Sequence, residues 1–456
     1  MVAFYKENKK KTFDRRAFEL ECTSLDLKGR GVGRHNGKVF FVDGMITGEC
    51  ARVQPLSVKD NTGTANIIKL LKASLARRKV SCVYAENCGG CPLAHIDPKT
   101  AFEAKIQGVR RLFARQLKVE LPDPEFTEFS KSTGYRRACR LSVRVDHGQM
   151  RIGFRSERSN QLCAIEKCEV FTDRLNAALP ALSKYLDQLS CRSRIGHVEL
   201  LDSDGALGIS LRLICDLPVK DESILEQLAS ELDAKISVQE PYVEKLGTDR
   251  SEKLRERIVS GFDRELFIEV DGIKISCDTT SFVQINADVN AKMVARVLES
   301  LGIKNGMKVI DLFCGLGNFT LPIAKAGAHC VGVDIVRAMT EKGMRNAQNN
   351  ALPARFAAAD LEAPFEAMSF AKDGYDAAVM DPGRSGAVRA VTYIAKQKVS
   401  KVVLISCNPL AAVRDLKTFL NSGYEISSWG AFDMFPRTAH IECLFVLETC
   451  KKKAKA

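Results

Sequence analysis

Cys407 is the residue in this sequence best suited to nucleophilic chemistry. It stands in Ser406-Cys407-Asn408-Pro409, after the run Lys401–Ser406, which predicts a buried strand followed by a helix. The thiol would then lie at the carboxyl edge of a sheet and beside a helix N-terminus, which lowers the pKa of a cysteine. A lone Cys is usually a small buried hydrophobic residue. The position and its neighbours nevertheless favour a nucleophile.

A glycine turn after another apolar strand predicts a ligand site. Val309–Thr320 contains a buried strand, the turn Gly315-Leu316-Gly317 and the start of a helix. Asp334 closes the next strand, 23 residues after Asp311, where a carboxylate can hold both ribose hydroxyls of an adenosine. A dinucleotide fold would use the same device, but the G-x-G-x-x-G spacing is absent. Asp-Leu-x-Cys-Gly-x-Gly resembles the first motif of Rossmann-like methyltransferases, which favours S-adenosylmethionine over a nicotinamide cofactor.

Two further carboxylates follow strands of the same region. Asp360 comes after the short apolar stretch Arg355–Ala359, from where it could reach the amino group of an adenine. Asp381 opens Asp381-Pro382-Gly383-Arg384 at the end of another strand. An Asp-Pro after a strand is usually a turn. Because ligands bind at the carboxyl ends of the strands in doubly wound sheets, we predict that both carboxylates belong to the ligand site.

Methyl transfer to C5 of a pyrimidine would use both a methyl donor and a cysteine. C5 does not attack a methyl donor unaided, whereas addition of a thiolate to C6 makes C5 enolate-like. A base must then remove the C5 proton so that the thiolate can leave. Glu442, in Arg437-Thr438-Ala439-His440-Ile441-Glu442 before the final strand, is the predicted base. His440 is expected to point the same way, and to orient Glu442 or contact RNA.

Three cysteines form the compact motif Cys82-x5-Cys88-Gly89-Gly90-Cys91-Pro92 in a polar, basic loop. This spacing suits an iron–sulfur cluster or zinc, with a distant fourth thiol to complete a tetrahedral site. The 16 cysteines of a chain expected to be cytoplasmic are mostly reduced, so a metal site is favoured over a chance group of thiols. Cys163 and Cys168 are the candidates for the fourth ligand.

Together these motifs resemble one family, the RNA uracil-C5 methyltransferases. The family pattern is Phe-x-Gln-x-Asn, Asp-Leu-x-Cys-Gly-x-Gly, Asp-Pro-x-Arg, Ser-Cys-Asn-Pro and a late His-x-Glu. All are present and in this order, and the first is Phe282-Val283-Gln284-Ile285-Asn286. The resemblance covers almost the whole chain. It implies a Rossmann-like methyltransferase domain that uses S-adenosylmethionine.

The resemblance also implies roles for single residues. Cys407 would be the nucleophile and Glu442 the base. The residues implied to line the methyl-donor site are Gln284, Phe313, Asn318, Asp334, Asp360 and Asp381. The implied ligands of a [4Fe–4S] cluster are Cys82, Cys88, Cys91 and Cys168, because Glu166-Lys167-Cys168 matches the family's fourth ligand better than Cys163 does. Asp334 stands where Glu is common, which shortens the reach of the carboxylate, and Gly383 stands where Pro or Ala is common.

An N-terminal TRAM barrel combined with such a cluster resembles the bacterial members that methylate 23S rRNA at the uridine usually labelled 1939. Another rRNA or tRNA uridine is the alternative. Three other classes are weighed against this hypothesis. An enzyme that methylates amino groups needs no thiol, and a radical enzyme that modifies tRNA would use Cys-x3-Cys-x2-Cys. A non-catalytic RNA-binding protein would not turn over S-adenosylmethionine.

The pattern of strands and helices along the chain, which must position these residues, predicts three domains. Residues 12–74 alternate as short strands and predict a small barrel, the TRAM RNA-binding barrel of the resemblance, with Arg30 and Arg34 in a glycine-rich loop that faces RNA. Residues 75–265 predict an α+β domain with the iron–sulfur cluster and RNA contacts, whose helix 97–118 can pack on the catalytic domain. Residues 266–450 alternate strand and helix, which predicts a doubly wound parallel sheet.

Composition and charge agree with an RNA-binding enzyme. The chain has 456 residues, of which 45% are hydrophobic and 27% charged, which excludes disordered and fibrous classes. No apolar run reaches the roughly 18 residues of a membrane helix, so we expect a cytoplasmic protein with neither a membrane nor an obligate protein partner. Residues 1–80 hold 17 basic and 8 acidic side chains, and residues 131–158 hold 8 basic and 2 acidic ones. This clustering predicts a polyanion as partner, and 23S rRNA by the resemblance.

Overall fold

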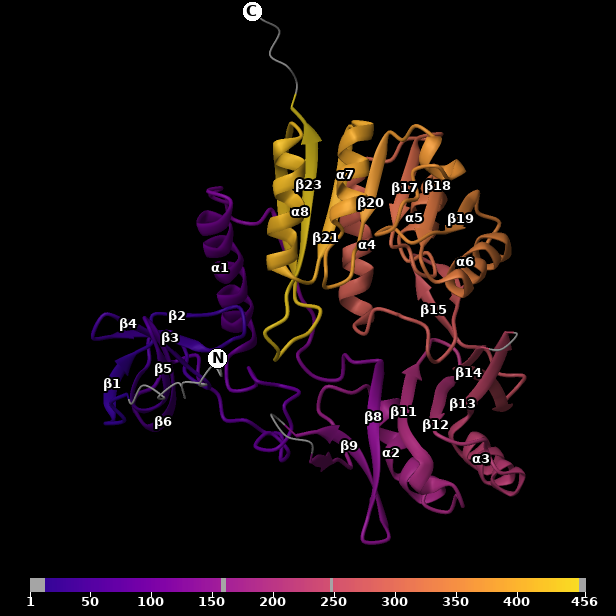
Figure 1. Ribbon diagram of the computed structural model, residues 1–456, viewed down its shortest axis with the longest axis horizontal. Coiled ribbons are helices and arrows are strands. Elements are labelled where there is room, and N and C mark those ends of the chain that lie inside the picture. Colours follow the sequence, from indigo (N-terminus) through magenta and orange to yellow (C-terminus); the bar gives the residue numbers. More distant parts are fainter. Residues whose placement is uncertain (1–12, 157–160, 247–248, 451–456) are drawn as a thin grey trace, which may run out of the picture. The chain divides into compact units, whose positions relative to one another are not determined.

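The computed structural model describes residues 13–156, 161–246 and 249–450, which form two compact units (Figure 1). The first unit comprises the residues through Ser81, Cys91–Arg111 and Arg437–Ala439. The second comprises Cys82–Gly90, Leu112–Pro436 and the chain from His440 onward. Arg158, one of the basic residues of the cluster 131–158, lies outside the described residues. In the described part of the chain, no helix is both long and apolar enough to cross a membrane.

The first unit contains a six-stranded sheet with the order β1-β5-β6-β4-β3-β2. Its strands are β1 (Phe18–Glu21), β2 (Ser24–Leu25), β3 (Gly31–His35), β4 (Lys38–Val42), β5 (Cys50–Lys59) and β6 (Thr62–Lys72). The inward positions of these strands, among them Leu20, Phe40, Val42 and Val53, form one small core. The period-two alternation seen in the sequence therefore corresponds to side chains that alternate between this core and solvent.

Most of the glycine-rich segment, residues 31–34, lies in strand β3, whereas a loop was predicted there; Gly29 and Arg30 form the turn before the strand. Gly33 lies within β3, where a Cβ atom would stand 2.3 Å from the carbonyl oxygen of Glu21, so only glycine allows this close approach of two strands. Arg30 is paired with Asp26 at 2.7 Å and lies over the Phe41 ring, 4.5 Å from its centroid. Its charge is therefore already engaged within the unit.

The second unit contains a seven-stranded sheet with the order β10-β9-β8-β11-β12-β13-β14. Its strands are β8 (Ala138–Asp146), β9 (Gln149–Arg155), β10 (Leu162–Ala164), β11 (Ile195–Asp202), β12 (Leu207–Leu213), β13 (Ala234–Leu246) and β14 (Asp249–Ser260). The 3-10 turn η1 (Arg192–Arg194) precedes β11. Helix α2 (Asp173–Leu186) packs on β9 and β11, and α3 (Val219–Leu232) packs on β13 and β14. The helices cover their strands with apolar residues such as Leu179 and Leu225.

The second unit also contains an eight-stranded sheet with the order β19-β18-β17-β20-β21-β23-β22-β7. Its strands are β7 (Phe126–Glu128), β17 (Lys308–Leu312), β18 (His329–Asp334), β19 (Ala354–Ala358), β20 (Ala377–Met380), β21 (Lys401–Ser406), β22 (Tyr424–Phe432) and β23 (Glu442–Thr449). The associated helices are α4 (Ala287–Leu301), α5 (Thr320–Lys325), α6 (Arg337–Asn349), α7 (Val388–Gln397) and α8 (Pro409–Asn421), with the 3-10 turn η2 (Ser369–Lys372). The hairpin β15 (Phe267–Val270) and β16 (Ile273–Ser276) precedes α4.

This sheet is mixed, so the expectation of a wholly parallel sheet was wrong. Strands β17 to β21 pair in parallel, whereas β23 is antiparallel to both β21 and β22. A loop without a helical crossover joins β22 to β23, and such a short connection can only join antiparallel strands. The sequence pattern also missed β7, which pairs with β22 although it lies far earlier in the chain.

The long helix α1 (Pro98–Gln116) contributes residues to both units. Near its C-terminal end the ring of Phe113 stacks on Phe445 of β23, with 5.2 Å between the ring centroids. Both rings are fully buried. Within the second unit, the end of this helix therefore packs on the eight-stranded sheet.

Candidate active site

The turn after β17 holds a strained residue that the sequence pattern did not reveal. Phe313 has a φ of +69°, a left-handed conformation that is uncommon for a bulky residue. The backbone N–H groups of Phe313 and Cys314 both donate to the carbonyl oxygen of Val333 on β18, at 2.8 and 3.1 Å. These two hydrogen bonds hold the turn against the neighbouring strand, and such backbone strain is concentrated at functional sites.

The two glycines of this turn have different structural roles. At Gly315 a Cβ atom would meet nothing within 4 Å, so open space lies beside its backbone. At Gly317, with a φ of +100°, a Cβ atom would stand 2.9 Å from both Leu321 and Phe356. Gly317 therefore permits tight packing of the turn. Only Gly315 leaves the approach to the backbone that we predicted for a ligand.

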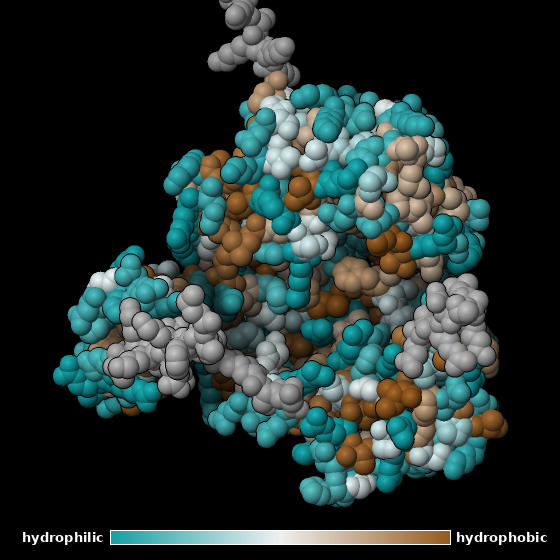
Figure 2. All heavy atoms as spheres, viewed as in Figure 1, coloured by the Kyte–Doolittle hydropathy of each residue, from teal (hydrophilic) through white to brown (hydrophobic). Residues whose placement is uncertain are grey.

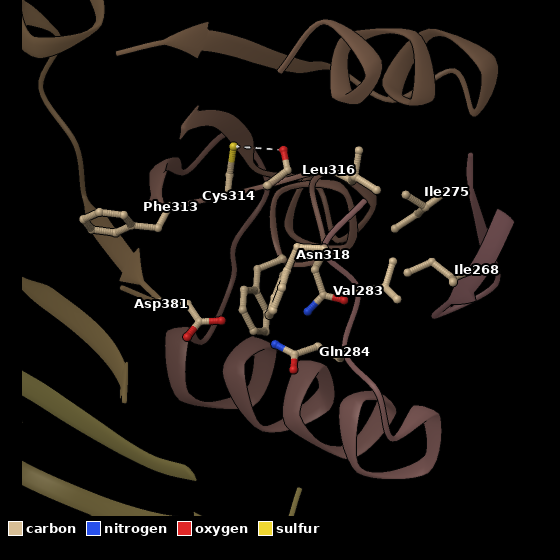
Figure 3. A pocket seen from close by; sticks show the side chains of 12 residues that line it. Ile268, Ile275, Val283, Gln284, Phe313, Cys314, Leu316, Asn318 and Asp381 are labelled. Carbon is tan, nitrogen blue, oxygen red and sulfur yellow. Dashed lines mark hydrogen bonds between the residues drawn. The ribbon is translucent and has the colours of Figure 1, made fainter. Parts of the chain in front are cut away.

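A pocket at this turn gathers four of the predicted site residues. It is lined by Ile268, Ile275, Phe282, Val283, Gln284, Phe313, Cys314, Gly315, Leu316, Asn318, Phe319 and Asp381. Figure 3 shows that the side chains of Gln284, Asn318 and Asp381 converge in it from three separate segments. Asn318 exchanges two hydrogen bonds with Asn290 of α4, at 2.8 and 3.0 Å, which fix the orientation of its amide. The pocket therefore combines apolar walls with oriented polar groups.

Asp334 and Asp360 lie at the ends of the next two strands and do not line this pocket. The two carboxylate oxygens of Asp334 accept the backbone N–H groups of Gly315 and Val336, at 3.0 and 2.9 Å. Each oxygen retains a second lone pair for a further donor. Asp360 is exposed, and one of its oxygens accepts the backbone N–H of Glu362.

Two buried aspartates carry perturbed pKa values. Burial raises the pKa of Asp381 to about 7. Burial also raises the pKa of Asp311 to about 7, and the hydrogen bond from the Thr320 hydroxyl opposes this shift. The other oxygen of Asp311, Oδ1, is buried without a hydrogen-bond partner in the described part of the chain. Two buried carboxyl groups, of which Asp381 lines the pocket, therefore have pKa values raised to about 7.

Cys407 and Glu442 face each other at the carboxyl edge of the sheet. The antiparallel pairing of β21 with β23 aligns Ser406 with Cys443, so the preceding Glu442 lies opposite the following Cys407. Glu442 is 7% exposed, whereas Cys407 is half-buried. A thiol and a carboxyl group are thus held close together, although 34 residues separate them in the sequence.

The charges at this edge act on one another. Burial and the charge of Asp381 raise the pKa of Glu442 well above its ordinary value, and Arg384 opposes the rise. Burial, then Glu442 and then Asp381 raise the pKa of Cys407 to about 11, again opposed by Arg384. Arg384 belongs to the Asp-Pro-x-Arg motif, but sequence reasoning assigned it no role. This edge thus brings together one thiol, two carboxyl groups and one cation.

Two expectations about this edge were wrong. A helix N-terminus was expected to lower the pKa of Cys407, whereas burial and two neighbouring carboxylates raise it. His440 was expected to point the same way as Glu442 along a strand. Strand β23 begins at Glu442, so the strand alternation does not extend to His440, whose exposed ring packs against Phe435.

Side chains of α8 hold the Asp381 loop against the Cys407 turn. Asn408 caps the helix, and its side-chain amide donates to the carbonyl oxygen of Arg384 at 2.8 Å. Asp415 of α8 accepts the backbone N–H of Ala387, and a Cβ atom on Gly386 would stand 2.5 Å from the same carboxylate. At Gly383 a Cβ atom would meet nothing, so glycine is not sterically required there.

The predicted metal ligands lie in two neighbouring loops of the second unit, except for Cys91, which belongs to the first unit. The thiol of Cys88 lies within electrostatic reach of Cys82, and those of Cys163 and Cys168 lie within reach of both. Burial is the main cause of the raised pKa of the Cys88, Cys163 and Cys168 thiols. Among the described residues, no three Cys, His, Asp or Glu side chains are grouped closely enough to hold a metal ion.

Backbone contacts join the two cysteine loops. Cys88 forms an isolated antiparallel bridge with Ser156, and the hydroxyl of Tyr84 accepts the backbone N–H of Glu166 at 3.1 Å. The backbone N–H of Cys168 donates to the side chain of Asn176 on α2 at 2.8 Å. The loops that carry Cys82 and Cys88 are thereby fastened to the segment that carries Cys163 and Cys168.

Comparison with known proteins identifies the family. The model of the tRNA (uracil-5-)-methyltransferase family matches residues 99–450. The 23S rRNA (uracil(1939)-C(5))-methyltransferase RlmD of Tolumonas auensis is 35% identical over 98% of this chain and 100% of its own length. RlmD of Photorhabdus laumondii is 36% identical over 97% of this chain and 99% of its own length.

A solved structure supports the fold. The tRNA (uracil-54, C5)-methyltransferase of Pyrococcus abyssi, in complex with S-adenosyl-L-homocysteine, superposes with a TM-score of 0.68 at 22% identity. The match covers 94% of this chain and all of the other. The chain therefore belongs to the tRNA (uracil-5-)-methyltransferase family, and it is an S-adenosylmethionine-dependent RNA uracil-C5 methyltransferase.

Proposed function

We propose that this enzyme methylates C5 of one uridine in 23S rRNA, the uridine labelled 1939 in the names of its relatives. One observation carries this choice of substrate. Relatives with that name match between 93% and 98% of this chain, including segments outside the part matched by the family model. The likeness therefore extends beyond residues 99–450 to the N-terminal sheet, to which we assign a part in selecting the RNA.

In the proposed reaction Cys407 is the nucleophile and Glu442 the base. The thiol loses its proton to solvent, and its sulfur forms a bond to C6 of the uracil, which places electron density on C5. C5 then forms a bond to the electrophilic methyl group that bound S-adenosylmethionine would supply, and the methyl–sulfur bond breaks to leave S-adenosylhomocysteine. Glu442 then takes the proton from C5, and the bond between Cys407 and C6 breaks to release thiolate and product. A buried carboxyl group with a raised pKa suits this step because its carboxylate is a stronger base.

The arrangement around Cys407 supports this assignment. Because the charge of Glu442 opposes ionisation of Cys407, the free site disfavours two negative charges. Arg384 is the cation that acts on both groups, so we assign it the role of stabilising the thiolate before it adds to the ring. The site is then least reactive when no substrate is bound.

The pocket beside the Phe313 turn is the proposed methyl-donor site. Gln284, Phe313, Asn318 and Asp381 would contact the donor, since they line one pocket with apolar walls. Asp334, at the end of β18, would hold the ribose hydroxyls with its remaining lone pairs. We propose that Asp360, at the end of β19, binds the adenine amino group.

The N-terminal six-stranded sheet is proposed to be a TRAM barrel that binds RNA, and Cys82, Cys88, Cys91 and Cys168 are proposed to bind a [4Fe–4S] cluster. The donor chemistry fits, because four thiolates are the usual ligands of such a cluster. Cys82, Cys88 and Cys168 also lie within one another's electrostatic reach. Methyl transfer requires no redox step, so the role of such a cluster would be structural. It would cross-link the two loops.

The substrate assignment is tested with purified enzyme and transcribed 23S rRNA, total tRNA and 16S rRNA in separate reactions. Labelled S-adenosylmethionine should transfer its methyl group to 23S rRNA. Mass spectrometry of nuclease fragments should place one 5-methyluridine at the position labelled 1939. A 23S transcript with cytidine at that position is the matched control and should remain unlabelled. Methylation of tRNA or of another rRNA uridine would refute the assignment.

A further inference from the structure

Among the described residues, helices α2 and α3 pack on one face of the seven-stranded sheet, and the β8–β9 part of the opposite face is largely exposed. Helices α2 and α3 pack on β9, β11, β13 and β14, and they bury the alternate positions Leu141, Ile152 and Val198. The residues between these positions point to the opposite face. On β8 and β9 that face carries four arginines, Arg140, Arg144, Arg151 and Arg155, all of which are exposed.

The register of the β8–β9 hairpin places two of these arginines directly opposite each other. Arg144 pairs with Arg151 between the aligned residues Val143–Ile152 and Val145–Met150. Like charges at opposed positions of antiparallel strands destabilise the pair. Neither arginine has a carboxylate partner in the described part of the chain. Figure 2 shows hydrophilic residues over this hairpin, at the lower edge of the view.

Arg140 on the same face differs from this pair. Its guanidinium contacts Glu199 of β11 at 2.5 and 2.7 Å, so its charge is balanced. Arg144 and Arg151 therefore form a site of uncompensated positive charge, and Arg140 provides an internal comparison in the same sheet.

The same face of the sheet continues toward the methyl-donor pocket and becomes buried on the way, since Ser210 and Ser237 are 1% and 6% exposed. Arg140, Glu199, Ser210 and Ser237 are aligned on four neighbouring strands. At the usual distance between strands this row spans roughly 15 Å. Glu256 accepts hydrogen bonds from Ser237 at 2.7 Å and from Thr280 at 2.9 Å. Thr280 precedes the pocket residue Phe282 by two positions, so this face of the sheet is continuous with the segment that lines the pocket.

We propose that Arg144 and Arg151 bind phosphate groups of the RNA backbone on the exposed β8–β9 part of this face. The inference rests on the proposed function only in that the substrate is an RNA. It adds the part of the protein surface that the RNA strand would contact. Guanidinium groups suit phosphates because their planar N–H forks match the phosphate oxygens. A phosphate between the two arginines would also relieve their repulsion. Contacts of this kind position an RNA without reading its sequence.

The test measures how salt affects binding of an unmodified single-stranded RNA whose sequence is unrelated to rRNA. Phosphate contacts are independent of sequence, so the result does not depend on which uridine is methylated. Each lost phosphate contact lowers the slope of log affinity against log salt by about 0.7 for a single strand. Replacing both Arg144 and Arg151 with Ala should therefore lower the slope by roughly 1.4 and weaken binding at low salt.

Three variants serve as controls. Arg144→Lys with Arg151→Lys keeps the charges and should retain most of the salt slope. Arg140→Ala should change the slope less than the double alanine variant, because Glu199 already balances its charge. Arg345→Ala with Arg355→Ala removes two exposed arginines from α6 and β19 and should leave RNA binding unchanged. All variants should bind S-adenosylmethionine like the unmodified enzyme, which shows that they are folded.

The salt dependence of RNA binding decides whether Arg144 and Arg151 contact the RNA. An unchanged salt slope in the double alanine variant, with normal binding of S-adenosylmethionine, would overturn the proposal. The same holds if the Arg345 and Arg355 control loses as much slope, because the effect would then reflect net charge alone. A normal loss of slope together with absent methylation of 23S rRNA would instead refute the proposed substrate and leave this RNA surface intact.

Discussion

The reactivity of Cys407 in the free enzyme should be low. Removing the charge of Glu442 should raise it, and removing the charge of Arg384 should lower it. The pKa of Cys407 is raised from 9.0 to about 11, first by burial and then by Glu442. Two pH units correspond to about one hundredfold less thiolate at a given pH near neutrality. Only the thiolate reacts with an alkylating agent. The rate should therefore rise about tenfold per pH unit from pH 7 to pH 10 without reaching a plateau.

Glu442→Gln keeps the size of the side chain and removes its charge. The thiolate is then repelled less, so alkylation of Cys407 at pH 9 should accelerate by about 3- to 10-fold, with burial still slowing it. Arg384→Ala removes the cation that stabilises the thiolate and should slow alkylation by a similar factor. The measurement is the rate at which iodoacetamide modifies the Cys407 peptide, followed by mass spectrometry without RNA or S-adenosylmethionine.

Three results would refute this reasoning. A plateau below pH 9 in the unmodified enzyme would show that burial and the carboxylates do not control the thiol. Slower alkylation in Glu442→Gln, or faster alkylation in Arg384→Ala, would contradict the sign of the proposed charge effects. Because the two variants are predicted to change the rate in opposite directions, a general loosening of the site cannot produce both outcomes.

The remaining predictions concern the chemistry and the cluster. RNA with 5-fluorouridine at the target should form a stable covalent adduct with the enzyme, because fluorine cannot leave C5 as a cation, and Cys407→Ala should form none. Glu442→Gln should accumulate a methylated RNA–protein complex on denaturing gels, because elimination stalls without a base. Cys88→Ala and Cys168→Ala should lose iron and the brown colour of anaerobically purified protein and bind RNA more weakly, whereas Cys163→Ala should retain iron.

Each of these predictions has an outcome that contradicts it. A persistent adduct in Cys407→Ala would remove this residue from the role of nucleophile. Normal turnover by Glu442→Gln would require another base, such as His440 or water. Loss of iron in Cys163→Ala but not in Cys168→Ala would reassign the fourth ligand. Zinc in the anaerobically purified protein would refute the iron–sulfur proposal.

Much of the pocket could be predicted from the sequence, because its residues follow strands. Periodicity and composition locate a buried strand, and in a doubly wound sheet the residue after the strand lies at the carboxyl edge. Phe313, Asn318 and Asp381 meet in one pocket for this reason. Gln284 joins them from a segment before α4, which motif resemblance indicated and periodicity did not. The left-handed conformation of Phe313 has no sequence signal, since bulky residues rarely adopt it.

The sequence by itself determined the order of the motifs, the strand–helix alternation and the candidate nucleophile and base, because these depend on neighbours along the chain. Tertiary structure alone decided that β23 runs antiparallel to β21 and so sets Glu442 opposite Cys407. It also decided that the pKa of Cys407 is raised, since burial and the charges of Glu442, Asp381 and Arg384 act through space from separate segments. Local patterns specify which residues follow a strand, but long-range pairing and burial determine what surrounds them.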